Sequence, residues 1–393
     1  MDFHRGVTSD QLPHWNSHNL SERRDSNVIV APTQYPSRTA FARDGGMQSH
    51  TSSKLTYPFA AAPAPGELID VAPGLRWLRL PLPYRLDHVN IYLIENQGGW
   101  TALDTGLGTD ESKQIWEDVL AGPLKGEGLK SLIVSHYHPD HVGLAAWMCA
   151  RFGLEMAMTR PEYLLSLVLQ HAPGDYGSEV YRPFYRRHGL DAEATEIVLS
   201  RGHEYLHRTT GVPPSYRRIR NGDTLAIGRR DFQVMTGGGH ALEQAMLYRP
   251  EDKLFLAADQ VIARISPNVS VHPMEASLDA LGLYLASLRS IKVAVAPDVL
   301  VLPGHGLPFY GLHDRIDELI AHHAERCGAI AMACATASLS VAEIVPHLFT
   351  RVLDAHQTGF AFGEVLAHVN HMLGRGELRL ETDASGVDRY RAA

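Results

Sequence analysis

Cysteine is rare in this 393-residue sequence, which contains only Cys149, Cys327 and Cys334. These three residues are too few and too widely spaced for a disulfide framework or a thiolate zinc site. No apolar run approaches the roughly 20 residues that a membrane-spanning helix needs, and no apolar stretch follows the first charges as it does in a secretory signal. We therefore expect a reduced, cytoplasmic location and no membrane association.

Positive charge is also in deficit, with 36 lysines and arginines against 44 acidic residues and a formal net charge of -8. A general nucleic-acid binder would carry a basic excess, so this class of function is not expected. The G-x-S-x-G pattern of serine hydrolases is missing as well, which argues against a serine nucleophile. The 45% of apolar and 20% of charged residues are ordinary for a globular protein with a sizeable core.

Potential metal ligands are concentrated in one short stretch, because His136, His138, Asp140 and His141 all lie within six residues. An apolar run precedes this cluster and a stretch with helical apolar spacing follows it, which predicts a strand-to-helix turn. If the strand continues through the cluster, His136 and His138 point the same way and share one ion. Asp140 and His141 lie beyond Pro139 and can serve a second ion. Isolated histidines are usually surface or core residues, but imidazoles and a carboxylate at this spacing suit zinc or iron.

The His-x-His-x-Asp-His order of this cluster resembles the signature of the metallo-β-lactamase superfamily, and further motifs of that superfamily follow in the expected order. Four positions that match these motifs each follow a strand-like run: Asp104, His240, Asp259 and His305. The resemblance extends over about residues 70 to 310. One position departs from many relatives, because Gln244 stands where they carry a second histidine four residues after the third motif. The substrate subfamily therefore stays open.

The resemblance implies a centre with two divalent metal ions, for which zinc is expected and iron or manganese are alternatives. One ion would be held by His136, His138 and His240, the other by Asp140, His141 and His305, and Asp259 would bridge them. Asp104 would orient the ligand loop by hydrogen bonds rather than touch metal. A hydroxide between the ions would be the nucleophile, because divalent ions lower the pKa of bound water from ~15.7 towards ~7. Asp140 would take and return a proton.

The order of the predicted elements favours an α/β fold. Two antiparallel meanders, each accompanied by helices, predict a four-layer αβ/βα sandwich whose loop edge carries the ligands. We expect residues 1–56 to be a disordered extension and residues 57–312 to form the metallo-β-lactamase-like catalytic domain. Residues 313–393 resemble the small, helical winged-helix appendage of some superfamily members, and Ser340–Glu343 has the spacing of a capping box.

Residues 160–220 form an insertion, with two expected helices, that the metal core does not need. Between Tyr181 and Arg230, ten arginines stand against five acidic residues. This excess indicates either a solvated helical face or a lid that attracts an anionic small-molecule substrate. Residues 316–393 hold six basic and ten acidic residues, so DNA binding is not expected there. Covering the active site and forming a homodimer are the alternatives for that segment.

Hydrolysis of an ester-like bond is the function that the resemblance implies. The expected substrate is a thioester of the acyl-glutathione or acyl-coenzyme A type, as for glyoxalase II-like proteins, or a lactone. Phosphodiester or RNA cleavage is an alternative within the same superfamily, and a redox role is a weaker one because no flavin domain is visible. A non-enzymatic ligand-binding scaffold is the alternative from another class, although a scaffold should have lost a ligand and this sequence has lost none.

Overall fold

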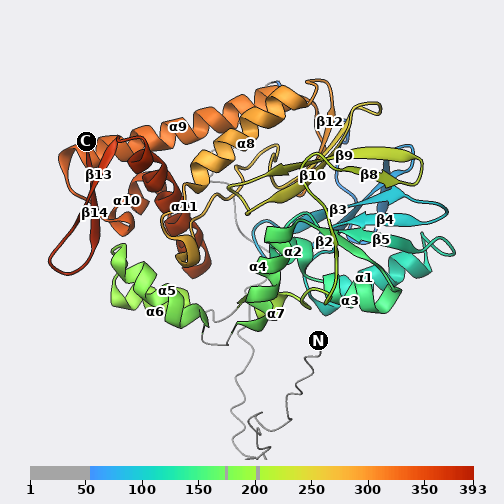
Figure 1. Cartoon of the computed structure of the whole chain (residues 1–393), viewed down its shortest axis with the longest axis horizontal. Helices are drawn as coiled ribbons and strands as arrows, with labels where there is room; N and C mark the ends of the chain where they lie inside the picture. Colours follow the sequence, from blue (N-terminus) through green and yellow to red (C-terminus); the bar gives the residue numbers. More distant parts are fainter. Residues whose placement is uncertain (1–53, 173–175, 201–203) are drawn as a thin grey trace, which may run out of the picture. The chain divides into compact units, whose positions relative to one another are not determined.

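The computed structural model describes residues 54–172, 176–200 and 204–393, all within the unit that begins at Gly45. The expected disordered extension therefore lies almost entirely outside the described residues. Two β-sheets lie face to face, and helices cover their outer faces (Figure 1). Among the helices of the described ranges, none is long and apolar enough to cross a membrane.

The first sheet contains seven strands in the spatial order β1 to β7. Neighbours from β1 to β4 are antiparallel, and neighbours from β4 to β7 are parallel. Its strands are β1 Leu68–Ala72, β2 Leu75–Pro81, β3 His88–Glu95, β4 Trp100–Leu103, β5 Leu129–Ile133, β6 Met156–Met158 and β7 Arg217–Arg218. The sequence did not predict the edge strand β7, because two exposed arginines carry no apolar alternation.

The second sheet has the order β12-β11-β10-β9-β8, in which β11 and β12 are parallel and the other neighbours are antiparallel. Its strands are β8 Thr224–Ile227, β9 Arg230–Gly237, β10 Gln244–Arg249, β11 Leu254–Ala258 and β12 Leu300–Pro303. Helix α8 (Ala280–Ala294) makes the crossover between the two parallel strands, as parallel pairs require. Both predicted meanders are therefore confirmed.

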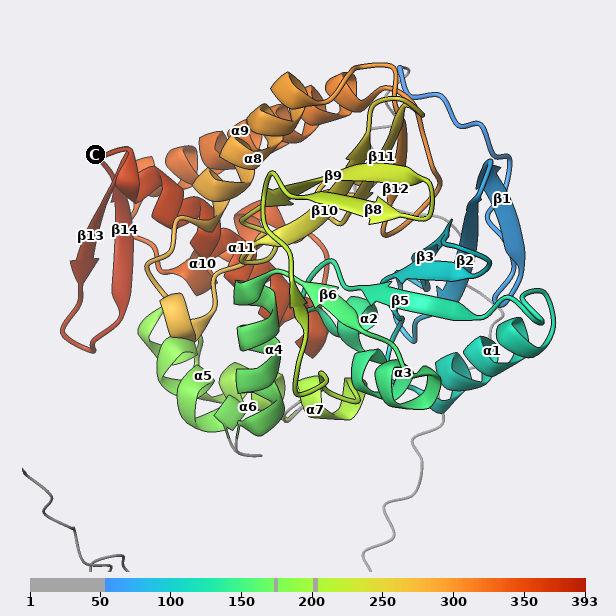
Figure 2. The ribbon, with the colours of Figure 1, turned by 45° about the vertical axis from the view of Figure 1, so that its right-hand side comes forward.

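Three apolar layers hold the sheets and helices together. Trp77 and Phe232 belong to the layer between the two sheets. Trp116 of helix α1 (Asp110–Ala121) packs in the layer outside the first sheet, and Leu288 of α8 packs in the layer outside the second. Figure 2 shows the resulting order of helices, sheet, sheet and helices. The predicted four-layer αβ/βα sandwich is confirmed.

The helix predicted after the histidine cluster, from Val142 to Phe152, begins three residues later than expected, and a separate short helix precedes it. Helix α2 (Pro139–Val142) ends just before Gly143, and α3 (Ala145–Phe152) begins two residues after this glycine. Gly143 lies so close to neighbouring backbone that an added Cβ would be 2.5 Å from the Gly106 carbonyl oxygen. This close approach holds the start of the helical region against the turn that follows β4.

Over its described residues, the insertion contains four helices: α4 Arg160–His171, α5 Tyr176–Arg187, α6 Ala192–Leu199 and α7 Glu204–Arg208. Helices α5 and α6 lie beside the C-terminal helices in Figure 2. The Phe184 and Tyr185 rings lie 6.1 and 5.2 Å from the ring of Phe362. Arg187 Nε lies 2.9 Å from the Asp388 carboxylate. The insertion and the C-terminal segment thus share a core and an ion pair.

The C-terminal segment has the predicted succession of helices and a ribbon. Its elements are α9 Leu312–Thr336, α10 Val341–Leu348, α11 Ala355–Gly374, β13 Leu378–Thr382 and β14 Asp388–Ala392. The two strands pair antiparallel. The capping box is present, because Ser340 Oγ accepts from the Glu343 amide and the Glu343 carboxylate accepts from the Ser340 amide. The likeness to a winged helix stays a prediction.

Two buried histidines meet between α9 and α11. His323 Nδ1 lies 3.0 Å from His368 Nε2, and His368 Nδ1 donates to the Glu364 carbonyl oxygen at 2.8 Å. Burial, followed by the nearby positive charge of Arg326 and the histidines around it, lowers the pKa of His368 to about 3. The same causes hold the pKa of His323 well below its usual value.

We expect this pair to make the free energy of unfolding depend on pH. Below pH ~6.5 the unfolded chain binds protons that native His368 does not take up until about pH 3, so stability falls as pH falls through this window. The expected loss is about 1.4 kcal/mol per pH unit for each such histidine. Denaturant unfolding of the chelated protein at pH 7 and pH 5.5 should show a smaller loss for His368→Leu than for the wild type. His347→Leu, at an exposed position, is the control; equal pH dependence in all three proteins would contradict the expectation.

Candidate metal centre

The turn after β4 forms hydrogen bonds with the histidine cluster and with Ser135, which precedes it. Asp104 has φ +69°, a left-handed conformation that is unusual for a residue other than glycine. Its Oδ1 accepts from the Ser135 amide at 2.7 Å, and its Oδ2 accepts from Ser135 Oγ at 2.9 Å and His141 Nδ1 at 2.8 Å. Thr105 Oγ1 donates to the His141 carbonyl oxygen at 2.7 Å. Asp104 therefore contacts the residues that orient the cluster.

Three histidine rings from two loops converge on one point. His136 Nε2 lies 2.8 Å from His138 Nδ1 and 3.3 Å from His240 Nε2, and the last two nitrogens are 3.1 Å apart. We call these residues the three-histidine group. Strand β5 ends at Ile133, so the condition under which strand alternation would turn His136 and His138 the same way is not met. The rings converge because His138 turns its Nδ1 inward whereas His136 uses its Nε2.

The hydrogen bonds of the outward ring nitrogens show which nitrogen of the His136 and His240 rings carries the hydrogen. His240 Nδ1 donates to the Asn268 carbonyl oxygen at 2.7 Å. Ser135 Oγ gives its proton to Asp104, so it accepts from His136 Nδ1 at 2.9 Å. The inward Nε2 atoms of both rings therefore present lone pairs. Facing lone pairs cannot bond to each other, but a tetrahedral zinc ion with Zn–N bonds of about 2.0–2.1 Å would separate its nitrogens by about 3.3 Å.

A second set of ligand atoms surrounds the carboxylate of Asp259. His305 Nε2 lies 3.3 Å from Asp140 Oδ2, and His141 Nε2 lies 3.6 Å from the same oxygen. We call Asp140, His141 and His305 the Asp140 group. Asp259 lies between the two groups, because its Oδ2 is 3.5 Å from His240 Nε2 and 3.1 Å from His305 Nε2. All seven predicted ligands are thus brought together.

Two observations fit a cation at this place. His141 Nε2 and Asp259 Oδ1 are buried and have no hydrogen-bond partner in the described structure, although they lie 3.4 Å apart. Unpartnered buried polar atoms are rare, and a bound ion is one of the few groups that satisfies both an imidazole lone pair and a carboxylate. Gly304 packs directly against this carboxylate and leaves no room for a side chain, because a Cβ there would overlap Asp259 Oδ1. The donor set fits divalent metal.

The two groups differ in protonation when no ion is bound. Burial lowers the pKa of each imidazole of the three-histidine group, so these rings are neutral. Burial alone would also lower the pKa of His305, but the Asp259 and Asp140 carboxylates outweigh it and raise that pKa to about 10. The same carboxylates raise the pKa of His141 well above its usual value. An ion at the Asp140 group must therefore displace protons.

One residue that the sequence did not single out joins the two loops of the three-histidine group. Glu162, in the first turn of α4, is fully buried. Its carboxylate accepts from the Tyr137 amide at 2.9 Å and from the Glu243 amide at 2.6 Å. Burial raises the pKa of this carboxyl to about 7, although the backbone amides that it accepts from oppose the shift. Glu162 thus fastens the loop of His136 and His138 to the loop of His240.

Other supporting groups had no recognisable signal in the sequence. His305 Nδ1 donates to the His88 carbonyl oxygen at 2.7 Å, as His240 donates to that of Asn268. Backbone carbonyls are the same in every residue, so neither acceptor could be found from residue type. Gln244, at the position where many relatives carry histidine, is buried with its Nε2 3.5 Å from Gln260 Oε1, and it belongs to neither of the two ligand groups.

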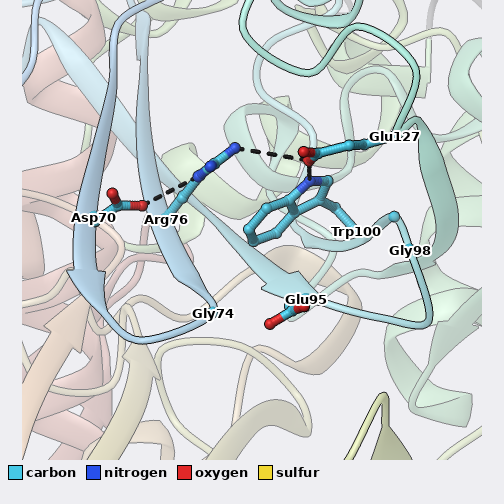
Figure 3. Close-up of a pocket in the computed structure, with 8 residues that line it drawn as sticks. Asp70, Gly74, Arg76, Glu95, Gly98, Trp100 and Glu127 are labelled. Carbon is cyan, nitrogen blue, oxygen red and sulfur yellow. Dashed lines mark hydrogen bonds and ion pairs between the residues drawn. The ribbon is translucent and has the colours of Figure 1, made fainter.

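A separate hollow of about 290 Å³ lies at the other end of the first sheet (Figure 3). It opens beside Trp100, which begins β4, whereas the metal centre lies beyond the end of that strand. The Arg76 guanidinium lies over the Trp100 ring at 4.5 Å and pairs with Asp70 at 3.1 Å. Glu127 accepts from the indole nitrogen and lies 3.8 Å from Arg76. These contacts satisfy one another, and the hollow is not part of the metal centre.

Comparisons with protein families agree with this geometry. A sequence profile of the metallo-beta-lactamase superfamily matches residues 84–305, which contain every candidate ligand. A second profile, the metallo-beta-lactamase-like C-terminal domain, matches residues 327–393. The probable metallo-hydrolase YqjP of Bacillus subtilis (strain 168) is 21% identical over 284 residues, which are 70% of this chain and 85% of that protein.

Solved structures show the same likeness. A beta-lactamase domain protein from Burkholderia ambifaria is 41% identical with a TM-score of 0.80, and the match covers 86% of this chain and 98% of that one. A metallo-beta-lactamase family protein from Thermus thermophilus is 27% identical with a TM-score of 0.70, over 82% of this chain and 100% of the other. With its ligand atoms, its four-layer sandwich and these similarities, the chain belongs to the metallo-beta-lactamase superfamily.

Proposed function

We propose that the protein is a metal-dependent hydrolase of an ester-like bond, with a thioester of the acyl-glutathione or acyl-coenzyme A type, or a lactone, as substrate. The observation that carries the proposal is the arrangement around Asp259, where the lone pairs of two sets of ligand atoms meet. Each of His141, His240 and His305 has its outer nitrogen held by a hydrogen bond. Such outer bonds orient an imidazole and raise its basicity as a ligand.

In this proposal two zinc ions are the resident cofactors. The three-histidine group would hold one ion and the Asp140 group the other, with the Asp259 carboxylate between the two groups. When bound, divalent ions supply positive charge that activates water and polarises a carbonyl oxygen. Iron and manganese are the alternatives, because imidazole and carboxylate ligands suit these ions as well.

The proton transfers are assigned to Asp140. Its side chain is 20% exposed, against 8% for Asp259, so it is the carboxylate of the centre that substrate and solvent can reach. Nearby His141 and His305 hold the pKa of Asp140 below its usual range against the effect of burial, which keeps the carboxylate ionised. An ionised, accessible carboxylate can accept a proton from water and return it to the leaving group. Asp104 and Ser135 contribute by fixing the rings of His136 and His141.

The test is to assay purified, metal-loaded protein against an acyl-glutathione, an acyl-coenzyme A, a lactone and a phosphodiester. We expect turnover of a thioester or a lactone, and no turnover after chelation. Turnover of the phosphodiester alone would replace the proposal by the phosphodiesterase function. Binding of a thioester without turnover, in protein that carries its metal, would favour the non-enzymatic scaffold.

An anionic substrate is a further part of the proposal, and it rests on exposed arginines. Four arginines of the arginine-rich stretch between Tyr181 and Arg230 pair with carboxylates, which compensate their positive charge. These pairs are Arg182 with Glu196, Arg187 with Asp388, Arg220 with Asp223 and Arg230 with Asp252. In contrast, Arg186, Arg217 and Arg218 are exposed and form no ion pair within the described ranges. Strand β7 is parallel to β6, so Arg218 lies beside the C-terminal end of β6. From that end of β6 the chain continues into α4, which carries Glu162.

Reversing these free charges, as Arg186→Glu, Arg217→Glu and Arg218→Glu together, should lower kcat/KM for an anionic thioester on the order of 10-fold at low salt. The loss should shrink at physiological salt, where the Debye length is ~8 Å. A neutral lactone should be hydrolysed at an unchanged rate, because the chemical step is untouched. The control is Arg229→Glu, at the exposed turn between β8 and β9, because His240 follows the opposite end of β9. Equal losses for both substrates, or no dependence on salt, would show that these arginines do not steer substrate.

A further inference from the structure

The segment from Asp259 to Val271 links two parts of the metal centre. It begins at the carboxylate between the two groups, and it contains Asn268, whose carbonyl oxygen accepts from His240 Nδ1. From Asp259 to His272 the chain forms neither helix nor strand, so its position depends on contacts outside itself. Inside the segment, Ser270 Oγ donates to Asn268 Oδ1 at 2.9 Å. Near its start, Gln260 is held by α8, because its carbonyl oxygen accepts from Tyr284 Oη at 3.1 Å and its Nε2 donates to Ser287 Oγ at 3.0 Å. Two further anchors, nearer to Asn268, come from the C-terminal helices.

The first anchor is Arg315 on α9. Its side chain is only 4% exposed, and its Nε donates to the Ile262 carbonyl oxygen at 2.7 Å. Its Nη2 donates to the Ile265 carbonyl oxygen at 2.9 Å, while its Nη1 lies 3.3 Å from Glu318 Oε2. A planar guanidinium presents several donors in a fixed fork, so it can hold two carbonyls at once, which an ammonium group cannot do with the same geometry. A buried charge also needs its partners, so this contact resists displacement.

The second anchor is Gly363 on α11. The Val271 amide donates to the Gly363 carbonyl oxygen at 3.2 Å. The approach is possible because position 363 has no side chain: a Cβ there would lie 3.0 Å from both Cβ and Oγ of Ser270. Such a distance is shorter than ordinary van der Waals contact. The helix and the segment therefore touch directly, three residues beyond Asn268.

We propose that the C-terminal helices are part of the metal centre, with Arg315 and Gly363 as positioning residues that place the Asn268 carbonyl and thereby the ring of His240. This inference rests on the proposed metal centre, in which His240 is a ligand. It gives the C-terminal segment a role distinct from binding DNA or a second copy of the chain. The two anchors stand on either side of Asn268, so disturbing either one should tilt His240 without touching any ligand side chain.

The test uses Gly363→Ala, with Gly374→Ala as its matched control on the same helix. A Cβ at Gly374 meets nothing within 4 Å, whereas a Cβ at Gly363 meets Ser270. Alanine favours helix at both positions, so helix propensity cannot account for a difference between the variants. Each variant is loaded with cobalt, and the absorption spectrum of bound Co²⁺, the metal affinity and the thermal unfolding of the chelated protein are measured.

We expect Gly363→Ala to weaken metal binding about 10–100-fold, as loss of a group that orients a ligand does, and to alter the cobalt spectrum. Gly374→Ala should match the wild type in both readouts. Combining Gly363→Ala with Ser270→Gly removes the contact and should restore the spectrum to that of Ser270→Gly alone. Arg315→Lys should weaken binding in the same direction, because a lysine keeps the charge but cannot hold both carbonyls.

A wild-type spectrum and affinity for Gly363→Ala, in protein that remains folded, would overturn the inference. Equal changes in Gly363→Ala and Gly374→Ala would also overturn it, because the effect would then be general to α11. These outcomes are distinct from failure of the proposed function, which would appear as absence of metal binding in the wild type itself.

Discussion

Protein purified in the presence of excess zinc and then freed of loosely held ions is expected to carry two ions per chain. Two sets of ligand atoms are present, and the carboxylate of Asp259 lies within 3.5 Å of ring nitrogens from both. If only the Asp140 group held an ion, the buried lone pairs of the three-histidine group would have no partner. If only the three-histidine group held an ion, the buried charges of the Asp140 group would have no cation. Elemental analysis against protein concentration measures the ratio directly.

Removing these ions should abolish activity and lower the thermal stability of the protein. An ion present at 1,000 times its dissociation constant stabilises the folded state by about 4 kcal/mol, so a chelator should lower the unfolding temperature by many degrees. His347→Leu serves as a control, because it removes an exposed histidine of α10 outside the centre, and this variant should still bind two ions. One ion or none in folded, metal-replete protein would refute the two-ion centre.

Asp259→Ala is expected to reduce activity by more than about 1,000-fold, whereas Asp104→Ala should cost about 10–100-fold, the usual effect of losing a group that orients a ligand. The Asp259 oxygens lie 3.1–3.5 Å from the inward nitrogens of His141, His240 and His305. In contrast, Asp104 bonds to Ser135 and to the outward nitrogen of His141. In the proposed two-ion centre, losing Asp259 would remove a ligand that lies between both groups, whereas losing Asp104 would only loosen a ring.

The comparison is made by kcat/KM on whichever thioester or lactone is turned over, together with the metal content of each variant. Asp259→Asn is the matched variant, because it keeps the shape of the side chain and removes its charge. We expect it to behave as Asp259→Ala does and to bind fewer than two ions. Equal losses at the two positions, or a greater loss at Asp104, would mean that their roles have been exchanged.

Much of the fold followed from local patterns, because the strands of both meanders are short apolar runs, several of them buried along their length, and are bounded by turns. Helices α1, α4 and α9 were predicted in the same way and agree with the structure to within a few residues. Helix α6 and the edge strand β7 were not predicted. The pairing of β7 depends on β6, a partner far away in the sequence, and its two exposed arginines have no periodic pattern of their own.

The identity and order of the candidate ligands were readable in the sequence because each one follows a strand, and strand ends in such a sandwich meet at one edge. The inward nitrogen of each ring was not readable, since it depends on hydrogen bonds to carbonyls and carboxylates elsewhere in the chain. His138 turns its Nδ1 inward although β5 ends before it. Rotation about the side-chain bonds therefore replaced the strand alternation that the sequence suggested.

Apart from Asp104, the supporting structure around the ligands was decided by tertiary contacts alone. In the sequence, Glu162 is an ordinary acidic residue in the first turn of a helix. Only the fold shows that amides from two ligand loops donate to its carboxylate. Arg315 and Gly363 look like ordinary helix residues until the segment around Asn268 packs against them. Backbone amides and carbonyls are common to nearly every residue, so the sequence specifies the ligands by side-chain type, and only the fold specifies which backbone groups hold them in place.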